Sequence, residues 1–195
     1  MFASLLEKIS DIDASVVLWA EKIRTPGLFD FFKITTYAGT IAVTAVIAVI
    51  TSIVLIRQHK RIYALYLWLA YLGAELTTWG IKYAVNRPRP NIIAGVREFN
   101  PSFPSGHTTA VTSIVLYILY LLVKSSSDTK TKTSYVIGAF SIVTFVSFSR
   151  IYLNVHYLSD VVVGFLIGLL WVLISCYFCE KTLSNRLGER RGSNR

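Results

Sequence analysis

Two histidines and an aspartate have the types and spacing of a nucleophile, its orienting base and a general acid. His156 and Asp160 are four residues apart, so on a helix they share one face, where the carboxylate can accept the proton of one ring nitrogen. The other ring nitrogen then directs its lone pair outwards, as a nucleophile requires. His107 has no carboxylate at such a spacing and follows a Ser-Gly pair. We therefore expect His107 to donate a proton to the leaving group.

Three cations, Lys82, Arg89 and Arg150, indicate that the attacked group is a phosphate. A phosphate monoester carries about two negative charges near neutral pH, and its hydrolysis requires charge on its oxygens to be stabilised. The planar fork of arginine binds two oxygens and lysine adds a point charge, so the three suit one dianion. Ser105 and Gly106 would add a hydroxyl and backbone N–H groups at a helix N-terminus. This chemistry needs no metal and no other cofactor.

These residues belong to three motifs in a fixed order. Residues 82–90 read Lys-x6-Arg-Pro, residues 104–107 read Pro-Ser-Gly-His, and residues 149–160 read Ser-Arg-x5-His-x3-Asp. The set resembles the three-part signature of the phosphatidic acid phosphatase type 2 and vanadium haloperoxidase superfamily, and no motif position is missing. If each residue type occurs at roughly one position in twenty, a chance match is negligible. The resemblance implies a phosphohistidine on His156, hydrolysed by water that His107 helps to activate.

Four further charged residues are candidates for the cavity or the substrate. Glu75 lies inside an apolar run, seven residues before Lys82 and hence on the same helical face. An acid in such a run is costly and is a functional candidate by default. It could pair with a motif cation, line the cavity, or be a protonated or internally hydrogen-bonded carboxyl. Arg87, Arg97 and Glu98 lie in or beside the loop between the first two motifs, where they could contact a second phosphate or a head group, or be solvated.

The distribution of apolar residues indicates the elements that must position these groups. The chain has 195 residues, of which 53% are hydrophobic and 16% are charged. Five apolar runs, each close to the roughly 20 residues that cross a hydrocarbon core, cover residues 34–56, 62–81, 105–123, 133–149 and 161–179. We expect an all-α integral membrane bundle of five to six transmembrane helices. Residues 34–180 would form the membrane-embedded phosphatase domain and residues 181–195 a basic cytoplasmic tail.

Residues 1–33 have the pattern of an amphipathic helix and its lead-in. The apolar positions recur at steps of four and three: Leu5, Ile9, Ile12, Val16, Trp19 and Ile23. Acidic and basic residues fill the other positions: Glu7, Lys8, Asp11, Asp13, Glu21 and Lys22. The longest uncharged stretch is too short to span a bilayer, so we expect an interfacial helix that ends before Pro26.

The basic loops predict the orientation. Residues 57–61, residues 124–132 and the tail fall on one side if the five spans alternate, and the positive-inside tendency makes that side cytoplasmic. The motif cations then lie on the extracytoplasmic face of the inner (plasma) membrane. The net charge of +9 is divided among loops and tail. It is explained by topology and by contact with anionic lipids, so we expect no nucleic-acid partner.

The expected substrate is a lipid phosphate or diphosphate, because the short loop of residues 91–103 leaves the site open to head groups at the membrane surface. The resemblance to small bacterial members favours undecaprenyl diphosphate. Phosphatidylglycerophosphate, phosphatidic acid and lipid A phosphates are alternatives, as is transfer of the phosphoryl group to another lipid. The complete set of His107, His156 and Asp160 argues against a non-catalytic phosphate-binding protein. The haloperoxidases are large soluble proteins, which disfavours that branch. The sequence leaves the oligomeric state open.

Overall fold

The computed structural model describes residues 2–90 and 98–192, and its regular secondary structure there is helical, as expected. The elements follow one another as α1 (Phe2–Lys22), α2 (Pro26–Thr35), the 3-10 helix η1 (Thr36–Gly39), α3 (Ile41–Arg57), α4 (Arg61–Val85), α5 (Gly106–Ser125), α6 (Thr129–Tyr152) and α7 (Leu158–Gly192).

Local signals account for several helix ends. Thr25 precedes Pro26, the first residue of α2, and its side chain accepts a hydrogen bond from the N–H of Leu28. Asp128 caps α6 in the same way, accepting from the N–H of Thr131 at 2.8 Å. At the other end of α4, Asn86 adopts the left-handed conformation that commonly terminates helices.

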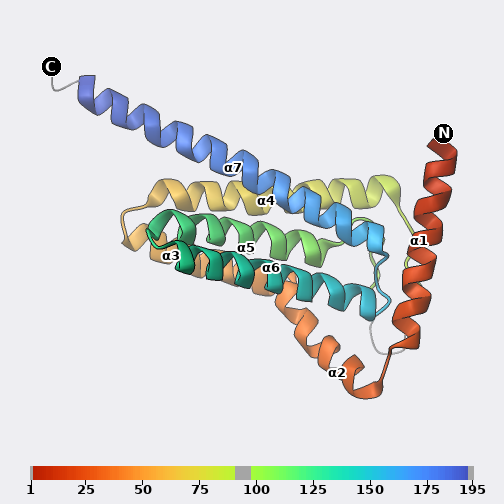
Figure 1. Ribbon diagram of the computed structural model, residues 1–195. Coiled ribbons are helices and arrows are strands. Elements are labelled where there is room, and N and C mark those ends of the chain that lie inside the picture. Colours follow the sequence, from red (N-terminus) through yellow and green to blue (C-terminus); the bar gives the residue numbers. More distant parts are fainter. Residues whose placement is uncertain (1, 91–97, 193–195) are drawn as a thin grey trace.

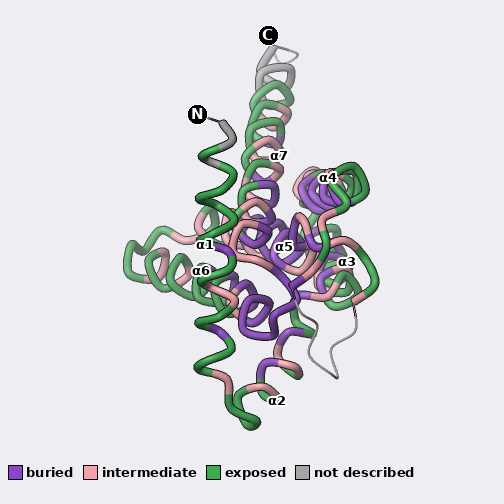
Figure 2. Tube along the Cα trace, turned by 90° about the vertical axis from the view of Figure 1, so that its right-hand side faces the viewer, coloured by how far each residue is buried: buried purple, intermediate pink, exposed green. Residues whose placement is uncertain are grey.

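Helices α3 to α7 form a bundle with α5 at its centre (Figure 1), in contact with α3, α4, α6 and α7. Figure 2 shows that buried stretches gather on α5 and on the parts of α4 and α7 nearest to it. Two glycines allow α7 to approach α5 closely. If Gly164 carried a Cβ, that atom would lie only 2.7 Å from the carbonyl oxygen of Ser105. A Cβ on Gly168 would lie 2.8 Å from the Cβ of Thr112. The Gly-x3-Gly pair therefore serves packing within the chain.

Three described helices, α5, α6 and residues 158–186 of α7, are long and apolar enough to cross a membrane. The run expected at residues 34–56 is not one straight helix. It is broken at Thr40, and the pair formed by residues 26–39 and α3 could make a fourth span bent by 44°. Helix α4 is absent from this set, although at 25 residues it is long enough. Five to six spans therefore stays a prediction.

Helix α1 lies across the end of the bundle at which α6 ends and α7 begins (Figure 1). Val16 and Ala20 pack against Ile151, Leu158 and Val161. Six other large apolar side chains among those that the structure describes in and just after α1 are exposed: Leu6, Ile9, Ile12, Leu18, Trp19 and Ile23. This exposed apolar surface suits the interfacial placement that the sequence predicts. At the other end of the chain, α7 continues without a break through residue 180, where we expected the domain to give way to the tail.

Candidate active site

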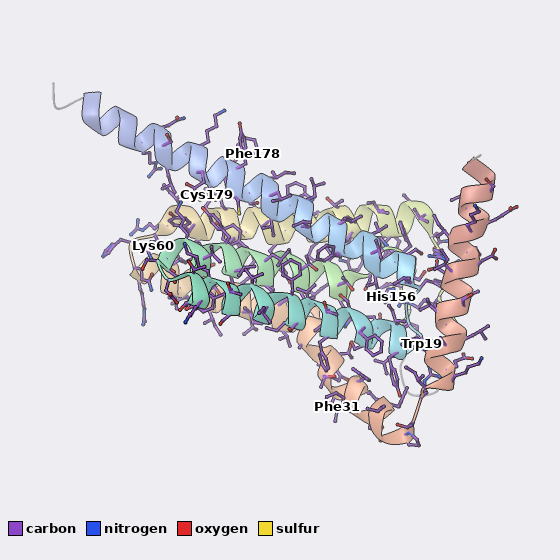
Figure 3. The ribbon with its side chains drawn as sticks, viewed as in Figure 1. Trp19, Phe31, Lys60, His156, Phe178 and Cys179 are labelled. Carbon is purple, nitrogen blue, oxygen red and sulfur yellow. The ribbon has the colours of Figure 1, made fainter. Side chains whose placement is uncertain are left out.

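The motif residues lie at helix ends that meet where α1 crosses the bundle (Figure 1). Lys82 is in the last turn of α4, His107 is the second residue of α5, Arg150 is in the last turn of α6 and Asp160 is the third residue of α7. Successive helices run in opposite directions, so these ends meet on one side. His156 lies between α6 and α7 and is labelled at this end in Figure 3.

His156 and Asp160 form the pair expected from their spacing. The Nδ1 atom of His156 lies 3.3 Å from Oδ2 of Asp160, and both side chains are buried. The prediction that the two residues share one helical face was wrong, because α7 begins only at Leu158 and His156 lies before it. The backbone folds back so that the same Oδ2 also accepts from the N–H of Tyr157 at 3.0 Å. This arrangement turns Nε2 of His156 away from the carboxylate and towards Arg89.

The surroundings of His156 favour a neutral ring. Burial lowers its pKa well below the ordinary histidine value, and the positive charges of Arg150, Arg89 and Lys82 lower it further. The guanidinium of Arg89 is 3.2 Å from Nε2. A phosphate bound to Arg89 would therefore lie close to the nitrogen that attacks it. A neutral imidazole whose Nδ1 is oriented in this way can attack phosphorus through Nε2 once Arg89 binds the phosphate.

Lys82 and Arg89 are held by backbone carbonyls around the site. Lys82 Nζ donates to the oxygens of Pro101 at 2.6 Å and Pro104 at 2.9 Å. Arg89 donates to the oxygens of Val155 at 2.7 Å and Asn100 at 2.8 Å. Both cations are thereby positioned before a substrate arrives.

One carboxylate bridges the two motif arginines. Glu98 Oε2 is 3.2 Å from the guanidinium of Arg89, and Oε1 accepts from the guanidinium of Arg150. Arg150 is 1% exposed, whereas the side chain of Glu98 is 22% exposed, so the carboxylate reaches a buried arginine from the edge of the site. A phosphate held by both arginines must therefore replace the carboxylate of Glu98.

Thr36 of η1 also contacts the third motif, and sequence reasoning missed it. Its Oγ1 accepts from Arg150 at 2.8 Å and from the hydroxyl of Ser149 at 3.1 Å. Nearby, a Cβ added to Gly39 would lie 3.2 Å from the Cβ of His107. Helix η1 thus forms one wall of the site. In the sequence, Thr36 differs from its surroundings only as a polar residue near the start of an apolar run, and this does not indicate a contact with Arg150.

The Pro-Ser-Gly-His motif supplies the start of α5. The N–H of Ser105 donates to the backbone oxygen of Asp160 at 3.0 Å, and its hydroxyl accepts from Thr108 at 3.1 Å. Gly106 has open space where a side chain would be, so a ligand can approach the first N–H groups of the helix. The ring of His107 makes no hydrogen bond within residues 2–90 and 98–192. It is therefore free to face a substrate.

Arg87 lies on the opposite side of Asp160 from His156. Its guanidinium donates to Oδ1 of Asp160 at 2.7 Å and to Oδ2 of Asp13 at 2.8 Å, and it lies 4.0 Å above the ring of Tyr157. Asp13 belongs to α1 and was expected among the polar positions of an interfacial helix, yet it is only 2% exposed. Nothing in its spacing distinguishes it from the other acids of α1.

Glu75 and Arg97 were also expected as cavity or substrate residues. Glu75 is 7% exposed, and neither of its carboxyl oxygens has a hydrogen-bond partner among the described residues. It therefore forms no ion pair with a motif cation in this part of the chain. Arg97 lies outside the described residues.

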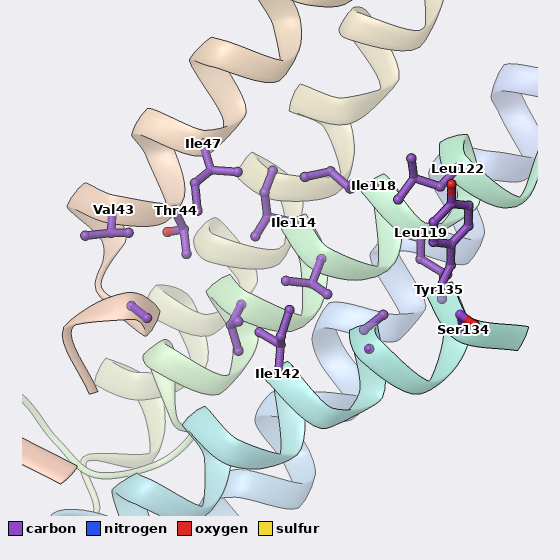
Figure 4. Close-up of a pocket in the computed structure, with 15 residues that line it drawn as sticks. Val43, Thr44, Ile47, Ile114, Ile118, Leu119, Leu122, Ser134, Tyr135 and Ile142 are labelled. Carbon is purple, nitrogen blue, oxygen red and sulfur yellow. The ribbon is translucent and has the colours of Figure 1, made fainter. Parts of the chain in front are cut away.

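An apolar groove adjoins the site (Figure 4). It has a volume of about 410 Å³ and runs between α3, α5 and α6 from Ala38 and Val111 towards Leu122 and Tyr135. Ala38 is next to Gly39, which packs against His107. The groove therefore starts beside the site and leads away from it along the bundle.

Comparisons with known proteins agree with this geometry. The family model described as PAP2 superfamily matches residues 63–183. Phosphatidylglycerophosphatase B of Bacillus subtilis (strain 168) is 30% identical over 174 residues, which cover 89% of this chain and 86% of that protein. The crystal structure of a transmembrane PAP2 type phosphatidylglycerolphosphate phosphatase from Bacillus subtilis superimposes with a TM-score of 0.82 at 30% identity, covering 89% of this chain and 87% of that one. Aquifex aeolicus LpxE shares the fold, with a TM-score of 0.67 at 24% identity over 84% and 94% of the two chains.

Proposed function

This chain belongs to the PAP2 superfamily and is a membrane lipid phosphatase, and from that premise we propose that it hydrolyses phosphatidylglycerophosphate through a phosphohistidine on His156. The observation that carries the mechanism is the buried His156–Asp160 pair, with Nδ1 turned to the carboxylate and Nε2 to Arg89. That arrangement prepares one nitrogen for attack on a phosphate brought in by the cations.

In the first step, phosphate oxygens replace Glu98 between Arg89 and Arg150. Nε2 of His156 then forms a bond to phosphorus while the bond from phosphorus to the lipid oxygen breaks. Protonated His107 gives its proton to that oxygen, and the alcohol departs. Charge on the transferring phosphoryl group is stabilised by Lys82 and the two arginines.

In the second step, water attacks phosphorus and the bond from phosphorus to Nε2 breaks. His107, neutral after the first step, accepts the proton of the attacking water. Inorganic phosphate leaves, and both histidines return to their starting state. Asp160 keeps its hydrogen bond to Nδ1 throughout and stabilises the ring when it carries positive charge.

Two features support phosphatidylglycerophosphate, which presents a terminal monophosphate. The relative that is 30% identical bears the name of a phosphatase of this lipid. Arg87, which we considered as a contact for a second phosphate, is instead engaged by two carboxylates. Lys82, Arg89 and Arg150 are then the cations for one phosphate. Undecaprenyl diphosphate stays a prediction, and the groove beside His107 suits a hydrocarbon chain of either lipid.

We place the site on the extracytoplasmic face of the plasma membrane. Lys60, in a basic loop, lies at the opposite end of the bundle from His156 (Figure 3). The positive-inside tendency assigns the end with Lys60 to the cytoplasm, which supports an active site on the other side.

The test is phosphate release in detergent from phosphatidylglycerophosphate, phosphatidic acid, a lipid A phosphate and undecaprenyl diphosphate. We expect the highest kcat/KM for the first, and loss of activity in His156→Ala. A higher value for undecaprenyl diphosphate would overturn the substrate and leave the reaction class intact. Retained activity in His156→Ala would overturn the mechanism. Mass spectrometry of the lipid products distinguishes hydrolysis from transfer to another lipid.

A further inference from the structure

Asp13 is an exception among the acids of α1. Glu7, Asp11 and Glu21 are exposed, whereas Asp13 is 2% exposed although it belongs to the same amphipathic helix. Burial of a carboxylate is unfavourable unless charged or polar groups compensate for the lost water. The groups that surround Asp13 therefore indicate why it is there.

Within the part of the chain that the structure describes, the hydrogen bonds to the Asp13 carboxylate come from the catalytic end of the bundle. Oδ1 accepts from the N–H of Ser159 at 2.9 Å, and Oδ2 accepts from the Ser159 hydroxyl and from Arg87 at 2.8 Å. Ser159 is in the first turn of α7 and directly precedes Asp160. Asp13 thus pairs with a backbone N–H that has no partner within the helix, and it places negative charge at the N-terminus of α7.

One guanidinium joins Asp13 to the catalytic pair. The second arm of Arg87 donates to Oδ1 of Asp160 at 2.7 Å, while Oδ2 of Asp160 faces Nδ1 of His156 at 3.3 Å. Each oxygen of Asp160 therefore has its own partner. Without the charge of Asp13, the fork of Arg87 could bind both oxygens of Asp160. That contact would draw Oδ2 away from His156.

We propose that Asp13 of α1 is a positioning residue for the phosphatase reaction, acting through Arg87 to hold Asp160 in the orientation that directs Nε2 of His156 at phosphorus. The inference rests on the proposed phosphohistidine mechanism. It makes the contact between Asp13 and Arg87 a condition for an oriented nucleophile. The nearby pair of Glu21 and Asn154, at 2.9 Å, also joins α1 to the loop before α7 but does not touch Arg87.

The test compares Asp13→Asn with two matched controls. Asparagine keeps an oxygen for the N–H of Ser159 and loses the charge that engages Arg87. We expect kcat to fall about tenfold, the size of effect typical of a lost charge-assisted hydrogen bond, with KM close to that of the wild type. Asp11→Asn removes the same charge from the exposed side of α1, and Glu21→Ala removes a docking contact. Both should keep the kcat of the wild type, and Asp13→Glu should recover part of the loss.

A double-mutant cycle separates positioning through Arg87 from a general structural role. In an Arg87→Gln background, Asp13→Asn should cause no further loss of kcat, because its intermediary is already absent. Losses that multiply independently would overturn the proposal. Thermal unfolding in detergent checks that each variant is folded, and the same cycle with Asp13→Glu replaces the first if Asp13→Asn does not fold.

The outcomes for the two proposals are distinguishable. A wild type that releases no phosphate from any lipid, or a His156→Ala variant that stays active, would refute the proposed function. An active, His156-dependent wild type in which Asp13→Asn has the same kcat as Asp11→Asn would refute only the role of Asp13.

Discussion

Glu98 forms an ion pair with Arg150 at the position where the motif predicts a substrate phosphate. Its second oxygen faces Arg89, so the carboxylate engages two of the three cations that the reaction requires. The protein thereby satisfies a buried arginine before substrate binds. Phosphate must compete with this carboxylate for the same guanidinium groups.

Glu98→Gln should therefore bind anions more tightly. An amide keeps a weaker acceptor for the arginines and removes the competing charge, so we expect the inhibition constants of phosphate and vanadate to fall by roughly tenfold. Competitive inhibition of phosphate release measures this. Glu180→Gln is a matched control, because Glu180 pairs with Lys124 on α5, away from the motif cations. Weaker inhibition of the Glu98 variant would show that the carboxylate organises the site and does not compete.

The two histidines should differ in their response to the leaving group. His156→Ala should form no phosphoenzyme with any substrate. His107→Ala should be slow with lipid phosphates, whose alcohol leaves poorly, and should be partly rescued by activated aryl phosphates, which need no proton. Acid-labile labelling with radioactive substrate phosphate, followed by quenching, reports the intermediate. Labelling of the His156→Ala protein would contradict the assignment.

The pH dependence should reflect the lowered pKa of His156. Burial and the neighbouring cations disfavour the protonated ring, so as the pH falls the nucleophile is lost only well below the ordinary histidine range. Arg89→Gln removes one positive charge, which should raise the pKa of His156 and move the acid limb of kcat/KM to higher pH. The two proteins are compared by the pH at which kcat/KM falls. The maximum value of kcat/KM is not used, because Arg89→Gln also weakens substrate binding. Ionisation of the substrate, at a pKa of about 6, is the same for both proteins. A limb that stays in place or moves to lower pH would contradict this prediction.

Topology can be tested with an impermeant thiol reagent in intact cells. In a background without Cys176 and Cys179, cysteine at Gln58 or Thr129 should resist labelling, because the basic loops are expected inside. Cysteine at Asn100, beside the site, should react. Permeabilised cells give the control in which all three positions are labelled. The reverse pattern would move the active site to the cytoplasmic face.

The sequence by itself determined which residues meet. Motifs at the ends of successive apolar runs must gather on one side when the helices alternate in direction, and this placed Lys82, His107, Arg150 and Asp160 together. Such a conclusion depends on the length of a span and on the order of the motifs, which are properties of the sequence. The pairing of His156 with Asp160 was predicted as well, but it is made by the turn before α7 and not by a shared helical face.

Only the tertiary structure decided what holds these residues in place. Thr36 reaches Arg150 across 114 positions of the chain, and Asp13 reaches Arg87 across 74. No periodicity links residues so far apart, and an acid on an amphipathic helix has the same local pattern whether it faces water or an arginine. The packing of α1 and η1 against the end of the bundle makes that distinction, because it removes water from these side chains and leaves residues of the motif segments 82–90 and 149–160 as their partners.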